Sequence, residues 1–319
     1  MNALQGIPGR AVAANPGREL LSSLRLCLTE ARPVVAVMFA LRYLTAAAVA
    51  GGFERATLAR ALAGSAIWVL AVLSTYLMNG TTDVAEDRVN HSRRPIASGR
   101  LAPATARRAA GLSAVAAVAG GLVLGGGFCL LVVAFLGVGY LYSAPPVCAK
   151  RYAATSALTG VMLALLTYGA AWAAAGAGPA GRTGVIFCAG AALWTGIVGS
   201  ITKDIPDAAG DMAAGRRTIA VRLGETASRR LACGAAVTIG AGFAVAAGLA
   251  GSLLVFPAAA MLGGALLVSV VTWPWRPGGA SARPGGGGRA PYRAFMATQY
   301  AAHLCLLLIL VLRALTLVG

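Results

Sequence analysis

The sequence predicts an all-α polytopic membrane protein with nine transmembrane helices in a single bundle. Three observations lead to this fold class. First, 58% of the 319 residues are hydrophobic and only 12% are charged, whereas a soluble domain carries about a quarter charged residues. Second, nine apolar runs are long enough to cross about 30 Å of hydrocarbon. Third, the basic residues gather on one side of these runs.

The nine apolar runs follow one another with short polar connections. Only Gly125-Gly126-Gly127 separates the third run from the fourth, and Gly251 separates the seventh from the eighth, so both pairs are expected to form antiparallel hairpins. We expect residues 1–30 to be a cytoplasmic tail and residues 31–319 to be one membrane domain. The runs lie near residues 33–52, 61–79, 108–125, 127–144, 155–176, 184–202, 229–250, 252–272 and 294–317.

The basic residues set the predicted orientation. With the N-terminus in the cytoplasm, 22 of the 27 Lys and Arg residues fall on the cytoplasmic side, in the tail, the loops and the adjacent helix ends. Such an excess follows the positive-inside rule. Basic loops beside anionic lipid headgroups also account for the net charge of +17, so we expect the bilayer and no nucleic acid as a partner.

Acidic residues give the strongest functional signal, because six of the ten lie in two clusters. The first cluster ends the second apolar run. In it Asn79, Asp83 and Asp87 recur every four residues, so on a helix their side chains share one face. Three such side chains beside hydrocarbon are costly unless a positive charge lies among them.

The second cluster ends the sixth apolar run and is expected on the same side of the membrane. Asp207 and Asp211 are four residues apart and Asp204 precedes Asp207 by three, so all three can share a helix face. Pro206 and Gly210 predict irregular backbone within it. Two facing clusters would clamp Mg²⁺ and a diphosphate, because Mg²⁺ prefers oxygen ligands and often completes its shell with substrate phosphate.

Cationic side chains near the clusters could bind the same diphosphate and stabilise it as a leaving group. Lys203 adjoins the second cluster and is the strongest candidate. Arg94 follows the first cluster, and Lys150 and Arg151 follow Tyr142 at the end of the fourth run. Positive-inside loops carry such residues regardless of catalysis, so no single one of them decides the function.

In combination these motifs resemble the UbiA superfamily of intramembrane prenyltransferases. The resemblance covers the chain from about residue 30 to its end. It rests on NxxxDxxxD at 79–87, RPIASG at 94–99, YSAPP at 142–146 before Lys150-Arg151, and KDxxDxxGD at 203–211. It implies an all-α bundle that binds Mg²⁺ through Asn79, Asp83, Asp87, Asp207 and Asp211, and a prenyl diphosphate through Lys150, Arg151 and Lys203. The predicted catalytic residues are Asp83, Asp87, Asp207, Asp211 and Lys203, and the predicted substrate-binding residues are Asn79, Lys150, Arg151, Arg94, Asp204, Tyr142 and Arg42.

Two positions depart from the pattern of many superfamily members. Gly80 stands where those members have Asp after the first Asn, and Gly199 stands where they have Tyr four residues before the lysine of the second motif. Neither change removes a metal ligand. The missing tyrosine argues against a close relation to the quinone-pathway members, in which that residue lies near the reacting groups.

The expected activity is Mg²⁺-dependent transfer of an isoprenoid from its diphosphate to a small aromatic acceptor. The allylic C–O bond would ionise in an apolar cavity that excludes water, with aromatic faces stabilising the cation. A membrane terpene cyclase that uses the same clamp without an acceptor is the alternative. A cation-coupled transporter is less favoured, because the acids lie at the ends of the runs and no clear internal repeat links the two halves.

Arg42 lies inside the first apolar run, where a lone arginine is a candidate functional residue. It could bind an acidic acceptor, or it could form an ion pair with Glu86 or another acid as a structural bridge. The sequence favours neither.

Overall fold

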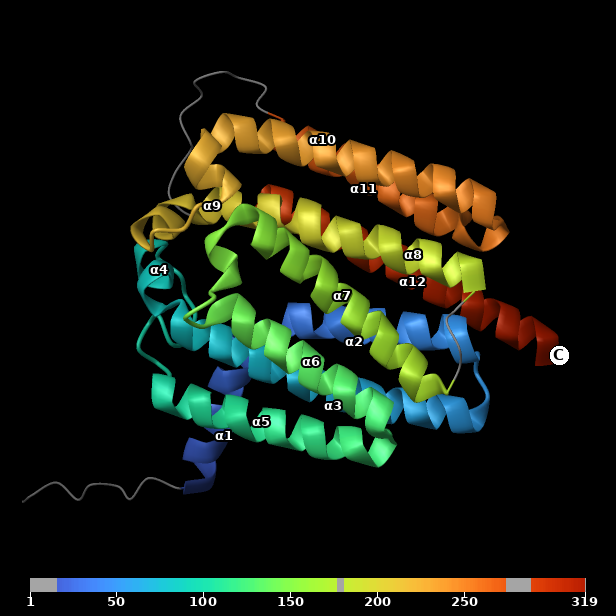
Figure 1. The fold of residues 1–319 in the computed structure, drawn as a ribbon, viewed down its shortest axis with the longest axis horizontal. Helices are drawn as coiled ribbons and strands as arrows, with labels where there is room; N and C mark the ends of the chain where they lie inside the picture. The colour runs from blue at the N-terminus through green and yellow to red at the C-terminus, as the bar shows by residue number, and fades with distance from the viewer. Residues whose placement is uncertain (1–15, 177–180, 274–287, 319) are drawn as a thin grey trace, which may run out of the picture.

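A computed structural model of the chain describes residues 16–176, 181–273 and 288–318. Figure 1 shows long helices packed side by side. Within the described residues there is no β-strand, only an isolated bridge between Tyr152 and Arg217. The predicted all-α fold class is confirmed. Of the predicted N-terminal tail, residues 1–15 lie outside the described part, whereas residues 16–30 form a helix.

The helices are bounded as follows. The α-helices are α1 (Pro16–Glu30), α2 (Pro33–Gly51), α3 (Arg55–Thr82), α4 (Val84–Val89), α5 (Pro103–Leu124), α6 (Gly126–Ser143), α7 (Ala153–Ala175), α8 (Gly181–Leu193), α9 (Gly199–Ala213), α10 (Ile219–Ala250), α11 (Val255–Thr272) and α12 (Ala290–Val318). Two 3₁₀ turns, η1 (Ala149–Arg151) and η3 (Ser252–Leu254), and a π-helical turn, η2 (Trp194–Val198), complete the described part.

Nine segments of the described chain are long and apolar enough to cross a membrane, as predicted, with α8, η2 and α9 forming one of them. Several helices extend beyond their apolar runs. Helix α3 begins at Arg55 rather than near residue 61, and the helix of the sixth run continues to Ala213 rather than ending near residue 202. Hydropathy marks only the part of a helix that suits hydrocarbon, whereas the helix itself continues into the polar interface.

The backbone around Pro206 is regular, and the prediction of irregularity there is wrong. Helix α9 is continuous from Gly199 to Ala213 with Pro206 inside it. The irregular stretch is η2, which directly precedes α9. Helix α9 packs against α10, α12 and α4, and such packing can hold a helix through a proline that local propensity alone would not tolerate.

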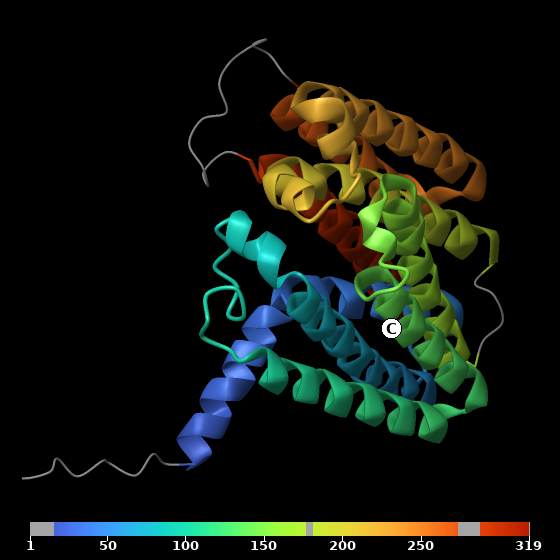
Figure 2. The same ribbon diagram turned by 60° about the vertical axis from the view of Figure 1, so that its left-hand side comes forward.

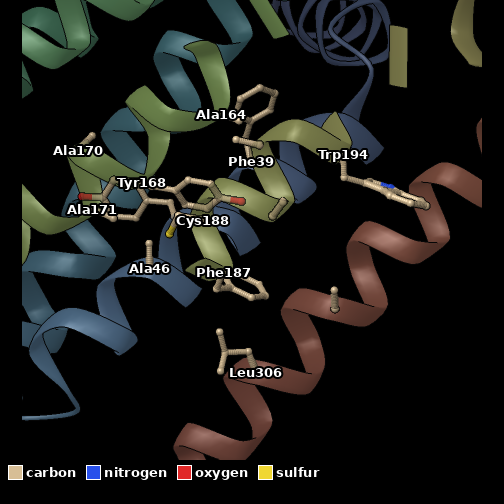
Figure 3. Packing of buried hydrophobic residues seen from close by; sticks show 14 of the residues in the cluster. Phe39, Ala46, Ala164, Tyr168, Ala170, Ala171, Phe187, Cys188, Trp194 and Leu306 are labelled. Atoms are coloured by element: carbon tan, nitrogen blue, oxygen red, sulfur yellow. The ribbon is translucent and has the colours of Figure 1, made fainter. Parts of the chain in front are cut away.

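Buried aromatic side chains interlock the helices. Trp68 of α3 is fully buried, lies 4.8 Å from Phe135 of α6 between ring centroids, and donates from Nε1 to Thr167 of α7 at 3.2 Å. Figure 3 shows a second group, in which Tyr168 of α7 and Phe187 of α8 lie near Leu306 of α12. Small alanines fill the space between these rings, so the helices approach closely.

Helix α1 extends away from the other helices in Figure 2 and contacts α3 and α5 near its C-terminal end. Its leucines Leu20, Leu21, Leu24 and Leu28 are exposed. Glu30, at the end of α1, is fully buried. The helix therefore brings one carboxylate into the protein next to the C-terminal end of α3.

Replacing Trp68 by Ala is expected to destabilise the protein by about 3 kcal/mol, because the substitution leaves a cavity among Phe135, Tyr43 and Thr167. Thermal unfolding in detergent measures the effect. Leu112→Ala on α5 is the matched control, since Leu112 is 72% exposed and its loss leaves no internal cavity. Equal melting temperatures for the two variants would contradict the central role given to Trp68.

Candidate active site

The two acidic clusters meet at one end of the bundle. Both Figure 1 and Figure 2 show α4 and α9 together there. Asn90, which follows α4, holds them in place. Its Nδ2 donates to the carbonyl oxygen of Asp207 at 3.3 Å, and its Oδ1 accepts from the backbone N–H of Gly210 at 2.8 Å. One side chain thus fixes the distance between the first cluster and α9.

Both clusters line one cavity, which extends from this end into the bundle between α2, α3, α6, α7, α9 and α12. Of the twelve predicted site residues, two do not line it: Arg94 and Arg151. The residues that do are Arg42, Asn79, Asp83, Asp87, Tyr142, Lys150, Lys203, Asp204, Asp207 and Asp211.

The first cluster keeps its spacing across a break between helices. Asp83 is the single residue between the two helices, directly after α3 and directly before α4. The N–H of Asp87 donates to the carbonyl oxygen of Asp83 at 2.8 Å. Asn79 Nδ2 donates to Asp83 Oδ2 at 2.8 Å. Ser143 donates to Asn79 Oδ1 at 3.0 Å, so the orientation of this amide is fixed. The three side chains face the cavity together.

Two lysines that line the cavity pair with its acids. Lys150 is buried, pairs with the carboxylate of Asp83 and donates to Thr82 Oγ1 at 3.0 Å. Lys203 donates to the hydroxyl of Tyr142 at 3.1 Å and lies 3.2 Å from a carboxylate oxygen of Asp204. Each lysine therefore already faces an oxygen-rich space.

Arg216 connects the two clusters directly. Its Nη2 lies 2.7 Å from both Asp83 and Glu86, and its Nη1 lies 2.9 Å from Asp211. Burial acts to raise the pKa of Asp83, but the positive charges of Lys150 and Arg216 outweigh this and lower the pKa below its usual value. Burial acts to lower the pKa of Arg216, but the three carboxylates raise it above its usual value.

Arg216 and Glu86 are absent from the predicted site. In the sequence, Arg216 stands out only as one of the basic loop residues that set the predicted orientation. A local signal could have found it. Helix α9 ends in a Schellman motif, in which Gly215 has φ of 68° and the N–H of Arg216 donates to the carbonyl oxygen of Asp211 at 2.8 Å. A glycine four residues after Asp211 thus predicts that the chain turns back and places the next side chain beside that acid.

Arg94 binds the first cluster from outside the cavity lining. It lies 2.8 Å from Asp87 and 2.7 Å from the buried Glu30, whose other oxygen accepts from the N–H of Ile96 at 2.9 Å. Its role in the structure is to orient Asp87 and to attach α1. Arg151 is exposed, and its backbone is held at both groups: its N–H donates to the carbonyl oxygen of Cys148 at 2.8 Å, and its carbonyl oxygen accepts from the N–H of Arg217 at 2.6 Å.

The two glycines that depart from the superfamily pattern lie where a side chain has no room. A Cβ at Gly80 would lie 2.3 Å from Glu30 and 2.8 Å from Arg94. A Cβ at Gly199 would lie 2.5 Å from the ring of Phe295, which stacks on Trp194. The ion pair of α1 fills the first space and an aromatic ring from α12 fills the second.

The carboxylates have the chemistry of a magnesium site. Two buried oxygens on the cavity, Glu86 Oε2 and Asp211 Oδ2, have no hydrogen-bond partner among the described residues. Unpartnered carboxylate oxygens are the ligands that a hard cation prefers. Within the described part of the chain, however, no three acidic, His or Cys side chains converge on one point, because Lys150 and Arg216 draw the carboxylates to themselves. The residues fit a divalent cation that competes with these two side chains.

The inner part of the cavity is aromatic and apolar. Phe39 lies 5.7 Å from Phe135 and 6.3 Å from Tyr76 between ring centroids, and all three line the cavity. Arg42 lines it as well and is hydrogen-bonded to Gln299 and Thr195. The proposed bridge to Glu86 is not formed, since Glu86 pairs with Arg216.

Comparison with known sequences identifies the family. The sequence model of the UbiA prenyltransferase family matches residues 34–283, most of the chain. The chain belongs to the UbiA prenyltransferase family. The resemblance noted in the sequence is thereby confirmed. With its nine apolar helices, this UbiA-family chain is an integral multi-pass membrane protein. No curated protein sequence matches it significantly.

Solved structures of other UbiA proteins share the fold. A UbiA homolog from Archaeoglobus fulgidus bound to DMAPP and Mg²⁺ superposes with a TM-score of 0.64 at 18% identity, over 87% of this chain and 99% of the other. An apo UbiA homolog from Aeropyrum pernix K1 gives 0.60 at 17% identity, over 85% and 96%. A digeranylgeranylglyceryl phosphate synthase gives 0.58 at 16% identity, over 91% and 98%. At these identities the likeness shows the fold alone.

Replacing Arg216 by Gln is expected to lower the stability of the metal-free protein by about 3 kcal/mol, because Asp83, Glu86 and Asp211 lose their shared cation. Mg²⁺ should then raise the melting temperature of the variant more than that of the parent protein, since the carboxylates are free to bind it. Thermal unfolding in EDTA and in excess Mg²⁺ measures both effects.

The matched control is Arg217→Gln, which removes an exposed arginine one residue away. It should behave as the parent protein under both conditions. If the Arg216 and Arg217 variants unfold at the same temperatures with and without Mg²⁺, Arg216 does not hold the acidic clusters together.

Proposed function

We propose that this protein is a Mg²⁺-dependent intramembrane prenyltransferase that moves an isoprenoid from a prenyl diphosphate to a small aromatic acceptor. The observation that carries the proposal is the juxtaposition of two acidic clusters and two lysines at one end of an aromatic cavity. Family membership supports it, as do the fold relatives, whose structures contain DMAPP or GPP together with Mg²⁺.

In this proposal the metal ligands are Asn79, Asp83, Asp87, Asp207 and Asp211. Bound Mg²⁺ would neutralise the diphosphate and make it a better leaving group. Asn90 and Ser143 support the arrangement, because they fix α9 and the Asn79 amide. When the metal binds, the cationic side chains of Lys150, Lys203 and Arg216 would move from the carboxylates to the diphosphate oxygens. The carboxylates would then pair with Mg²⁺ and the cations with the diphosphate, so every charged group keeps a partner of opposite charge.

The reaction would begin with cleavage of the bond between C1 of the isoprenoid and its diphosphate oxygen. The electron pair leaves with the diphosphate, where the cationic side chains stabilise it. The allylic cation remains beside Phe39, Tyr76 and Phe135, whose ring faces favour positive charge and whose packing excludes water. The acceptor then forms a bond to C1 and loses a proton.

Asp83→Ala and Asp207→Ala are each expected to lower Mg²⁺-dependent diphosphate release by about a hundredfold or more, because each removes a ligand from one side of the clamp. The assay uses purified protein in detergent with C10, C15 and C20 prenyl diphosphates. Glu225→Gln is the control, since Glu225 is an exposed acid paired only with Arg229 on α10. Full activity in both aspartate variants, confirmed as folded, would refute the clamp.

Product analysis of the same reactions separates transfer from cyclisation. A product that forms only when an aromatic acceptor is added supports the transferase. A hydrocarbon or terpene alcohol that forms at the same rate without any acceptor would mean a terpene cyclase. If no prenyl diphosphate is consumed and Mg²⁺ still binds, a cation transporter becomes the better hypothesis.

We also propose that the acidic clusters face the cytoplasm, on the basis of the positive-inside distribution of Lys and Arg. In a variant that lacks the six native cysteines, Arg93→Cys should be protected from a membrane-impermeant maleimide in intact cells, and Glu54→Cys should be labelled. Both positions are exposed; Glu54 directly precedes α3, whereas Arg93 follows α4, beyond the other end of α3. The reverse labelling pattern would invert the proposed orientation.

A further inference from the structure

Helix α1 exposes an apolar stripe along most of its length. At about 100° of rotation per residue, four of its leucines fall within an arc of about 100°. Their side chains are 50–62% exposed, so they form one contiguous apolar surface rather than scattered single residues. This surface, the leucine stripe, consists of Leu20, Leu21, Leu24 and Leu28. Water is a poor environment for this face of the helix.

The bundle covers a different face of α1. Cys27 packs with Leu77 of α3 and Ala106 of α5, and Glu30 is fully buried. These contacts lie in the C-terminal half of the helix, whereas residues 18–22 are all exposed. Figures 1 and 2 show α1 running crosswise to the long helices. The leucine stripe thus extends sideways from the bundle, at the end where the acidic clusters meet.

Positive charge borders the leucine stripe. Arg18 and Arg25 are exposed on the helix face next to it, and Glu19 is the only exposed acid of α1. Arg107 and Arg108 are exposed on the first turns of α5, which pack against α1. An apolar stripe flanked by arginines is the pattern of helices that lie in the interface of an anionic membrane.

The position of α1 in the chain decides which surface the stripe meets. Only Ala31 and Arg32 separate α1 from α2, which is one of the membrane-spanning segments. The leucine stripe therefore continues the lipid-facing surface of the bundle at the level of the headgroups. A soluble partner would have to displace lipid to reach it, whereas the bilayer already surrounds the bundle there.

The buried end of α1 reaches the acidic clusters. Glu30 lies 2.7 Å from Arg94, and Arg94 lies 2.8 Å from Asp87. Because Glu30 neutralises Arg94, the carboxylate of Asp87 is freer to bind a metal ion. If α1 moved away from the bundle, Arg94 would keep only Asp87 as a partner and would compete with the metal for it.

We propose that the leucine stripe docks on an anionic lipid surface, and that this docking holds Glu30 on Arg94 and frees Asp87 for Mg²⁺. The docking is independent of the proposed function. The link to Mg²⁺ rests on it, because Asp87 is a metal ligand only in that proposal. Anionic headgroups would pair with Arg18 and Arg25 while the leucines insert among the acyl chains. Lipid composition would then set the metal affinity of the protein.

Spin labels measure the docking in the full-length protein. In a variant without the six native cysteines, a nitroxide is attached at Leu24→Cys on the stripe or at Ser22→Cys on the polar face. The vesicles contain phosphatidylcholine with about 30% phosphatidylglycerol. Oxygen partitions into lipid, so it should relax the label at residue 24 about threefold more than the label at residue 22. A water-soluble nickel chelate should show the opposite preference.

Each other labelling pattern would overturn the docking. Equal access of the nickel chelate to both labels would place the stripe in water. Protection of the label at residue 24 from both reagents would mean a protein partner, such as a second copy of this chain. Replacing Arg18 and Arg25 together by Gln should reduce the contrast between the labels to the lower value expected in pure phosphatidylcholine. An unchanged contrast would contradict the role of anionic lipid.

Two matched substitutions test the link to Asp87. Leu24→Glu adds a charge to the stripe, and Ser22→Glu adds the same charge to the polar face; both positions are exposed. In the anionic vesicles, Leu24→Glu should raise the Mg²⁺ concentration that gives half-maximal thermal stabilisation by about threefold or more, and Ser22→Glu should change it far less. Unfolding is followed by tryptophan fluorescence. Equal shifts in the two variants would contradict the link.

Glu30→Gln breaks the link at its other end. Arg94 then pairs with Asp87 alone, so the same Mg²⁺ midpoint should rise about tenfold. Glu19→Gln removes an exposed acid of the same helix and should keep the parent value. Failure of the two proposals is distinguishable. If Mg²⁺ does not stabilise the parent protein, the proposed metal site is refuted together with the link to it. If Mg²⁺ stabilises the parent, Glu30→Gln and Leu24→Glu proteins at one midpoint, only the role of α1 is refuted.

Discussion

The pairing of Arg216 with three carboxylates is the interaction on which the end of the bundle that carries the acidic clusters depends. Asp83 and Glu86 come from one half of the chain and Asp211 from the other, so a single guanidinium joins the two halves. Without it, like charges would face one another in a largely buried space and would separate α4 from α9. The same competition between Arg216 and Mg²⁺ would couple assembly of the site to metal binding.

Buried charge is distributed unevenly through the bundle. At the end of the bundle where the acidic clusters meet, each acid that lines the cavity has at least one close cation, and Glu30 with Arg94 extends this network to α1. In the inner cavity the only charge among the described lining residues is Arg42, and its neighbours are neutral.

Fold class and membrane topology followed from the sequence, because burial in lipid demands long apolar helices whatever their packing. The acidic clusters followed as well, since regular spacing puts side chains on one helix face. The local backbone conformation was predicted less accurately. Pro206 lies in an uninterrupted helix, and the irregular turn precedes it, because contacts from α4, α10 and α12 decide which local conformation survives.

By itself the sequence determined the bundle of nine spans, the placement of both acidic clusters at the same end and the residue types that suit a metal and a diphosphate. Only the tertiary structure decided which cations serve the site. Lys150 enters it whereas the adjacent Arg151 remains exposed, and Arg94 turns toward Glu30. It also decided that Arg42 has neutral partners. Such pairings join residues that lie far apart in the chain, so no spacing in the sequence encodes them, and they form only when the helices pack.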